Sequence, residues 1–131
     1  MFTREQYLMG RDKEYPLTPE LEKNLTTLME KVAALEEEMP EDMWLKVSSG
    51  YRPGRYNVAA GGAPKSAHLT AEAVDIQDPT GAIDEWCAAH LDILAHLGLC
   101  LENPRKTVGW THLDLKKRYD KNGNRIWMFL P

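Results

Sequence analysis

The sequence has few cysteines: only Cys87 and Cys100 occur among its 131 residues. Small secreted domains that depend on disulfides carry more cysteines in a shorter chain. A chain of this length can bury about two-thirds of its unfolded surface, so its hydrophobic core suffices without such cross-links. We therefore expect both thiols to be free and mostly buried, although the sequence alone leaves a Cys87–Cys100 bridge open.

Long apolar runs are missing as well. No stretch approaches the roughly 18 apolar residues that a membrane-spanning helix needs. The first 15 residues, MFTREQYLMGRDKEY, contain no apolar segment typical of a secretory signal. The sequence therefore predicts a soluble product synthesised in the cytoplasm, without membrane insertion.

Positive charge is not in excess, because 16 Lys and Arg stand against 20 Asp and Glu, for a net charge of -4. A general nucleic-acid binder normally carries a basic stripe, so we expect no nucleic-acid partner. The chain also lacks repeats and low-complexity linkers. Its length fits one domain, and the prediction is a single domain over residues 1–131.

Apolar residues recur every three or four positions in two segments, which is typical of helices that bury one face. N-terminal caps, prolines and glycines mark the ends of these segments. The expected helices are a short one over Thr3–Met9, a long one capped by Thr18 and ended by Pro40, and one over Ile83–Leu97 stopped by Gly98.

Short apolar runs predict strands at Trp44–Ser48, Ala73–Ile76, Leu99–Leu101 and Trp110–Leu115. Asn122-Gly123 is a hairpin turn signal, which predicts that residues 125–129 fold back onto residues 117–119. The fold class expected from this order is α+β, with a small, mainly antiparallel sheet packed against two main helices. Between the first two strands, residues 50–64 form a long ordered loop, and loops of that length are usually functional or disordered.

Two of the four histidines have acidic partners in strand-like segments. Asp75 lies in an apolar run that follows His68, and a buried carboxylate must be paired, hydrogen-bonded or bound to a metal. On the later strand, Trp110, His112 and Asp114 share one face, because side chains alternate along a strand. Two histidines and an aspartate form the ligand set of a zinc ion that keeps a position open for water. The spacing alone leaves open that these residues only form hydrogen bonds.

His90 and His96 differ from this pair. Both lie in the helix expected over residues 83–97, and neither has a metal-ligating partner three or four residues away. We interpret them as surface or packing residues.

Several motifs follow one another between Ser48 and Asp114. They are Ser48-Ser-Gly-Tyr-Arg-Pro53, Asn57, Gly61-Gly-Ala-Pro-Lys-Ser66-Ala-His68, Asp75 after six further residues, and Trp110-Thr-His112. This order resembles the M15 group of zinc peptidases, which contains D-alanyl-D-alanine carboxypeptidases and dipeptidases and phage endolysins that cut L-alanyl-D-glutamate bonds. The resemblance implies a zinc metallopeptidase acting on peptidoglycan peptides, with Zn²⁺ held on the sheet by His68, Asp75 and His112.

The chain departs from the family pattern at two positions. Ala71 replaces a common family glycine, and Gly109 occupies the position where many members carry a Glu, three residues before the second histidine. We therefore expect Glu102 to act as the general base, with Asp114 as the alternative or as support for His112. A third alternative is that no base works, which would make the chain a non-catalytic zinc-binding relative, for example a structural or binding domain of a phage.

Four further residues of the matching segments are expected at the site. Arg52 would stabilise a developing oxyanion or hold a substrate carboxylate. Ser66 would form a hydrogen bond to substrate or to a ligand, and Tyr51 and Trp110 would wall the cleft. For each of the four, a purely structural role stays open.

The resemblance also suggests where such an enzyme acts. We expect a monomer that reaches the cell wall after release by a partner or at lysis. Which peptide bond is cut stays open, since carboxypeptidase and endopeptidase relatives share the zinc motif.

Overall fold

Helix α2 (Pro19–Glu38) is the longest element of the computed structural model, which describes residues 1–131. The Thr18 hydroxyl accepts a hydrogen bond from the Leu21 N–H at 3.2 Å and caps the helix, as the sequence predicts. Helix α1 (Arg4–Leu8), also predicted, begins with a capping box between Thr3 and Gln6. The buried residues of α2 are Leu25, Leu28, Val32 and Leu35. They form part of the hydrophobic core.

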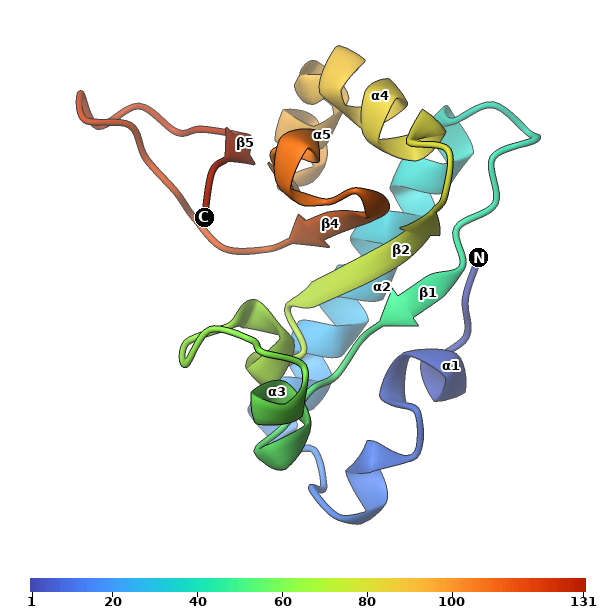
Figure 1. Ribbon diagram of the computed structural model, residues 1–131, viewed down its shortest axis with the longest axis vertical. Helices are drawn as coiled ribbons and strands as arrows, with labels where there is room; N and C mark the ends of the chain where they lie inside the picture. The colour runs from blue at the N-terminus through green and yellow to red at the C-terminus, as the bar shows by residue number, and fades with distance from the viewer.

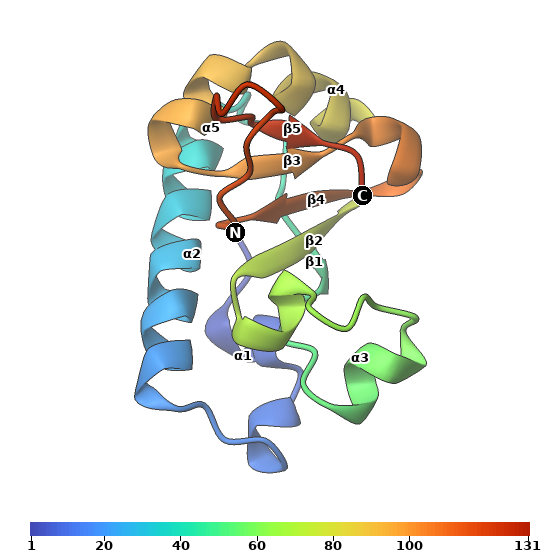
Figure 2. The same cartoon turned by 90° about the vertical axis from the view of Figure 1, so that its left-hand side faces the viewer.

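The sheet has five strands in the order β1-β2-β4-β3-β5. Their bounds are β1 (Val47–Ser49), β2 (Ala73–Asp78), β3 (Cys100–Glu102), β4 (Gly109–Asp114) and β5 (Met128–Phe129). The first three pairings in this order are antiparallel, and β5 runs parallel to β3. Helix α2 runs along one side of the sheet, and the segment around α3 lies on the other (Figure 2). The expected α+β class with a mainly antiparallel sheet is confirmed.

The helix expected over Ile83–Leu97 is wrong in one respect, because it is broken in two. Helix α4 (Ala82–Ala89) ends and α5 (Leu91–Leu97) begins at His90, whose backbone is not helical (φ -128°, ψ 43°). The His90 ring nitrogen Nδ1 lies 2.7 Å from the Trp86 carbonyl oxygen, which the His90 N–H would take in an unbroken helix. The His90 N–H instead donates to the Cys87 carbonyl oxygen, and the helix turns at this point. None of the helices is both long enough and apolar enough to cross a membrane.

Residues 50–64, expected as a long ordered loop, contain the short helix α3 (Arg55–Ala59). Asn57 is buried and donates from Nδ2 to the Ala63 carbonyl oxygen at 2.9 Å, which ties the loop to itself. A Cβ atom at Gly62 would clash with the side-chain amide of Asn57, so a larger residue would displace this amide. The loop leads into the 3₁₀ turn η2 (Ala67–Thr70), which carries His68. Two other 3₁₀ turns are η1 (Arg11–Lys13) and η3 (Pro104–Lys106).

The hairpin expected near the C-terminus forms only next to its turn. Tyr119 and Arg125 make an isolated antiparallel bridge in the segment between β4 and β5, which projects from the rest of the fold (Figure 1). Strand β5 then leaves the hairpin and pairs with β3 (Figure 2). The N–H groups of Leu101 and Asn103 donate to the carbonyl oxygens of Trp127 and Phe129, at 2.8 and 2.7 Å. An open strand edge needs hydrogen-bond partners, and the returning chain supplies them.

Both cysteines are free and buried, as expected. Burial raises the pKa of the Cys87 thiol to about 12, so it is protonated and inert at neutral pH.

Candidate metal centre

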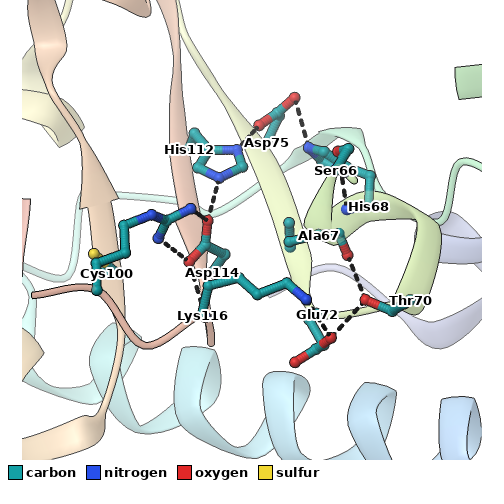
Figure 3. Close-up of polar contacts among 12 residues, drawn as sticks. Ser66, Ala67, His68, Thr70, Glu72, Asp75, Cys100, His112, Asp114 and Lys116 are labelled. Atoms are coloured by element: carbon teal, nitrogen blue, oxygen red, sulfur yellow. Dashed lines mark hydrogen bonds and ion pairs between the residues drawn. The ribbon is translucent and has the colours of Figure 1, made fainter. Parts of the chain in front are cut away.

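The side chains of His68, Asp75 and His112 meet on one face of the sheet (Figure 3). His68 comes from η2, whereas Asp75 and His112 are direct partners across the β2–β4 pairing. All three residues are buried, and their potential ligand atoms lie within 4.8 Å of one another. The group could hold a metal ion.

The ring of His68 is held in one orientation by the backbone. Its Nδ1 lies 2.7 Å from the Gly50 carbonyl oxygen, which can only accept, so Nδ1 carries a proton and, in the neutral ring that a metal requires, Nε2 has the lone pair. The Ser66 hydroxyl accepts a hydrogen bond from the His68 backbone N–H at 3.2 Å and caps η2. The buried Nε2 has no hydrogen-bond partner, although it lies 3.2 Å from an Asp75 carboxylate oxygen. Buried polar atoms are rarely left in this state, and a bound cation would use the lone pair.

His112 lies between two carboxylates (Figure 3). Its Nδ1 is 2.8 Å from Asp75 Oδ1, and its Nε2 is 2.7 Å from Asp114 Oδ2. Burial opposes a charged ring, but Asp114 and Asp75 outweigh it and raise the pKa of His112 to about 9. Histidines that bind metals typically donate their other N–H to a carboxylate, and Asp114 is placed to accept from Nε2. Nδ1 would then be the nitrogen available to a metal.

Asp75 is surrounded by positive or potentially positive groups. Burial alone would raise the pKa of its carboxyl group, but the imidazoles of His112 and His68 hold it below its usual value. Arg52 Nη1 lies 3.9 Å from Asp75 Oδ2. The carboxylate is therefore ionised at neutral pH, as a metal ligand must be.

Asp114 is fully buried at the end of β4, and its carboxylate accepts hydrogen bonds from several donors. Both terminal nitrogens of Arg118 donate hydrogen bonds to this carboxylate, at 2.7 and 3.0 Å, and the Lys116 backbone N–H donates at 3.0 Å. The importance of Arg118 is not evident from the sequence, because this residue follows the strand in an irregular segment where no periodicity predicts contacts.

A cavity of about 1000 Å³ opens over these residues. Eight of the nine expected site residues line it, namely Arg52, Ser66, His68, Asp75, Glu102, Trp110, His112 and Asp114. Tyr51 does not, and its expected position in the cleft wall is wrong. Its side chain belongs to the hydrophobic core, and its hydroxyl donates to the Tyr15 carbonyl oxygen at 3.1 Å. An aromatic ring buries a large apolar area there, which explains its place in the core.

A family model described as Peptidase M15 matches residues 6–114, which is most of the chain. The chain belongs to the peptidase M15 family. This membership supports a metallopeptidase, and thus a hydrolase with a peptide substrate. No curated protein and no solved structure matches the chain.

In this M15 family member, Gly109 cannot supply the general base, and its backbone conformation explains why a Glu would not suit the position. Gly109 has a φ of +98°, which glycine adopts without strain but other residues avoid. It pairs with Asp78 at the start of β4 and does not line the cavity.

Glu102 lies on the neighbouring strand β3. Cys100 and Leu101 pair with Asp114 and Leu113, so the same register continued by one residue places Glu102 opposite His112. Residues opposite each other in a sheet point to the same face, which explains why Glu102 lines the cavity. Burial raises the pKa of Glu102, and the nearby His112 offsets part of this effect.

The last residues of this M15 peptidase, which follow the region that the family model matches, form one wall of the cavity. The residues beyond Asp114 that line it are Lys116, Lys117, Arg118, Tyr119, Ile126, Phe129, Leu130 and Pro131. The turn signal in this segment predicts a hairpin, and nothing in the local sequence predicts its contribution to the site.

Proposed function

We propose that the chain is a zinc-dependent peptidase that hydrolyses a peptide bond in peptidoglycan stem peptides, of D,D-carboxypeptidase or L,D-endopeptidase type. Zn²⁺ would be held by His68 Nε2, the Asp75 carboxylate and His112 Nδ1. The observation that carries the proposal is the buried Nε2 of His68, which forms no hydrogen bond and lies 3.2 Å from an Asp75 oxygen, in one group with His112, in a member of a peptidase family.

The donor set suits a catalytic zinc ion. Two imidazole nitrogens and one carboxylate oxygen leave a fourth position open in a tetrahedral site. The cavity beside them gives a peptide access to that position. When bound, zinc lowers the pKa of its water toward 7 and polarises the carbonyl group of the bond to be cut.

Glu102 is the proposed general base. Its carboxylate would take a proton from the attacking water and return it to the leaving amine. Its support is its position beside His112 in the cavity and a pKa raised by burial, which makes the carboxylate a better proton acceptor.

Arg52 is the proposed anion-binding group. Its Nη1 lies 3.9 Å from Asp75, its Nε has no hydrogen-bond partner, and its side chain is largely buried at the edge of the cavity. A guanidinium placed in this way would bind a substrate carboxylate or the oxygen that gains negative charge. Ser66 accepts a hydrogen bond from the His68 backbone and could still donate its hydroxyl hydrogen to substrate, and Trp110 would wall the cleft.

A second candidate function is a zinc-binding domain without catalytic activity, for example one that forms part of a phage particle. The observation that favours it is Gly109, since many family members carry their base at that position. The two candidates share the metal site and differ only in turnover.

Zinc analysis and a hydrolysis assay separate these candidates. The purified protein should contain one zinc per chain, and incubation with purified peptidoglycan or short L,D-peptides should release new amino groups until a chelator is added. Zinc without new amino groups would favour the binding domain. A protein that takes up no zinc would contradict both candidates.

A further inference from the structure

We propose that Arg118 is a positioning residue for the metal ligand His112 and that it acts through Asp114. This inference rests on the metal site proposed above. Arg118 itself does not reach the ligand group, so its role would be to fix the ring that does.

Three side chains are linked in series by short hydrogen bonds. The Arg118 guanidinium donates to both oxygens of Asp114, at 2.7 and 3.0 Å, and Asp114 Oδ2 lies 2.7 Å from His112 Nε2. A bidentate guanidinium–carboxylate pair fixes the plane of the carboxylate. The carboxylate then fixes the orientation of the imidazole and assigns its proton to Nε2, which leaves Nδ1 free for a metal.

Phe129 packs its ring against the guanidinium of Arg118. The guanidinium carbon of Arg118 lies 3.4 Å from the centre of the Phe129 ring. The same ring packs edge-on against His112, with centres 5.9 Å apart at 79°. Phe129 is also the β5 residue that pairs with Glu102. Arg118 is thus partly buried and packs directly against the site.

The charge of Arg118 matters because Asp114 is fully buried. An imidazole that binds a metal through one nitrogen is neutral, so it gives Asp114 no positive charge. Without Arg118, Asp114 would be a buried carboxylate with no cation in contact, which is strongly unfavourable. We expect such a carboxylate to shift toward water and to release the His112 ring.

Both Arg118 and Phe129 follow the region that the family model matches, residues 6–114. The metal ligands lie inside the matched region, and the group that holds one of them in place comes from the last residues of the chain. The C-terminal segment is therefore part of the metal site and not only a wall of the cavity.

The test is the zinc affinity of Arg118→Ala, measured by competition with a chromophoric chelator. If Arg118 positions His112, affinity should fall about 10- to 100-fold, as for other partners of metal-ligating histidines. Removal of a nearby positive charge would by itself strengthen the binding of a cation, so the two effects have opposite signs. Affinity equal to or above that of the wild type would overturn the proposal.

Arg125→Ala is the matched control. Arg125 lies in the same C-terminal segment and stacks on the Trp127 ring, 4.2 Å from its centre, but it does not line the cavity. Its loss should leave zinc affinity unchanged. An equal loss of affinity in Arg125→Ala and Arg118→Ala would show a general effect on the segment and would contradict a specific role for Arg118.

Two further measurements keep the proposal testable if Arg118→Ala folds poorly. Arg118→Lys keeps the charge but loses the paired hydrogen bonds, so its zinc affinity should be intermediate. In Asp114→Asn, adding Arg118→Lys should cost little more, because the carboxylate through which Arg118 acts is already gone. Fully additive losses would show that Arg118 acts without Asp114.

The nitrogen chemical shifts of the His112 ring give a readout that is independent of activity. The zinc-loaded wild type should show a protonated Nε2, and Arg118→Lys should show a weaker preference for this tautomer. A wild type that binds no zinc would refute the proposed function. A wild type that binds zinc, with variants that bind it equally well, would refute only the role of Arg118.

Discussion

The two histidines of the candidate metal centre are held in place by different means. His68 lies on a 3₁₀ turn, and a backbone carbonyl, that of Gly50, fixes its ring. His112 lies inside the sheet, where the buried carboxylate of Asp114 and the guanidinium of Arg118 fix its ring. A backbone contact therefore orients His68, whereas a hydrogen-bonded series of charged side chains orients His112. Substitutions around the two histidines should have different consequences.

The largest expected effect is the loss of the metal. His68→Ala and His112→Ala should each abolish stoichiometric zinc binding, but their metal-free forms should differ in stability. Removal of His112 takes a cationic partner from two buried carboxylates, and the free energy of unfolding should fall by about 3–5 kcal/mol. Removal of His68 leaves the Gly50 carbonyl group without a donor and takes one of two imidazoles from Asp75, which keeps His112 as a partner, so the cost should be smaller, about 1–3 kcal/mol.

Zinc titration followed by urea unfolding of the metal-free proteins would measure both quantities. The wild type without metal is the reference. Equal losses of stability in the two variants would contradict the difference between the two sides, and full zinc uptake by either variant would contradict the ligand assignment.

Glu102→Gln should separate proton transfer from metal binding. The amide keeps the size of the side chain but cannot accept a proton, so kcat should fall about 10²- to 10⁴-fold while zinc affinity stays close to that of the wild type. Steady-state kinetics on a stem peptide, together with chelator competition, would measure both. Full activity of this variant would exclude Glu102 as the base and would leave Asp114 as the alternative base.

The smallest effect is expected at the support of His68. Ser66→Ala removes the cap of η2, and the free energy of unfolding should fall by about 1 kcal/mol. Zinc affinity should change less than in Arg118→Ala, because the Gly50 carbonyl still holds the ring. Thermal unfolding and chelator competition of the two variants, measured in parallel, would show whether the charged side of the site is the more sensitive one.

Much of the fold follows from local sequence patterns. The apolar stripe and the cap at Thr18 predict α2, and alternation along residues 110–115 predicts a strand with His112 and Asp114 on one face. The break at His90 does not follow from the sequence pattern, because it depends on a ring nitrogen that competes for the Trp86 carbonyl group. Periodicity contains no information on such a contact.

The candidate site, too, is only partly predictable from the sequence. The spacing of His68, Asp75 and His112 is visible in the sequence, and the structure brings these side chains together. The burial of Tyr51 and the contact of Arg118 with Asp114 depend on how distant segments pack. Likewise, the parallel pairing of β5 with β3 is a long-range contact, and the local turn signal at Asn122-Gly123 predicted a simple hairpin instead.

A zinc-bound crystal structure tests the central claim most directly. The account predicts one zinc ion bound by His68 Nε2, an Asp75 oxygen and His112 Nδ1, with His112 Nε2 still donating to Asp114. A Glu102 oxygen should lie about 3 Å from whatever occupies the fourth position. Zinc bound through His112 Nε2 and Asp114, or at another place in the chain, would contradict the account.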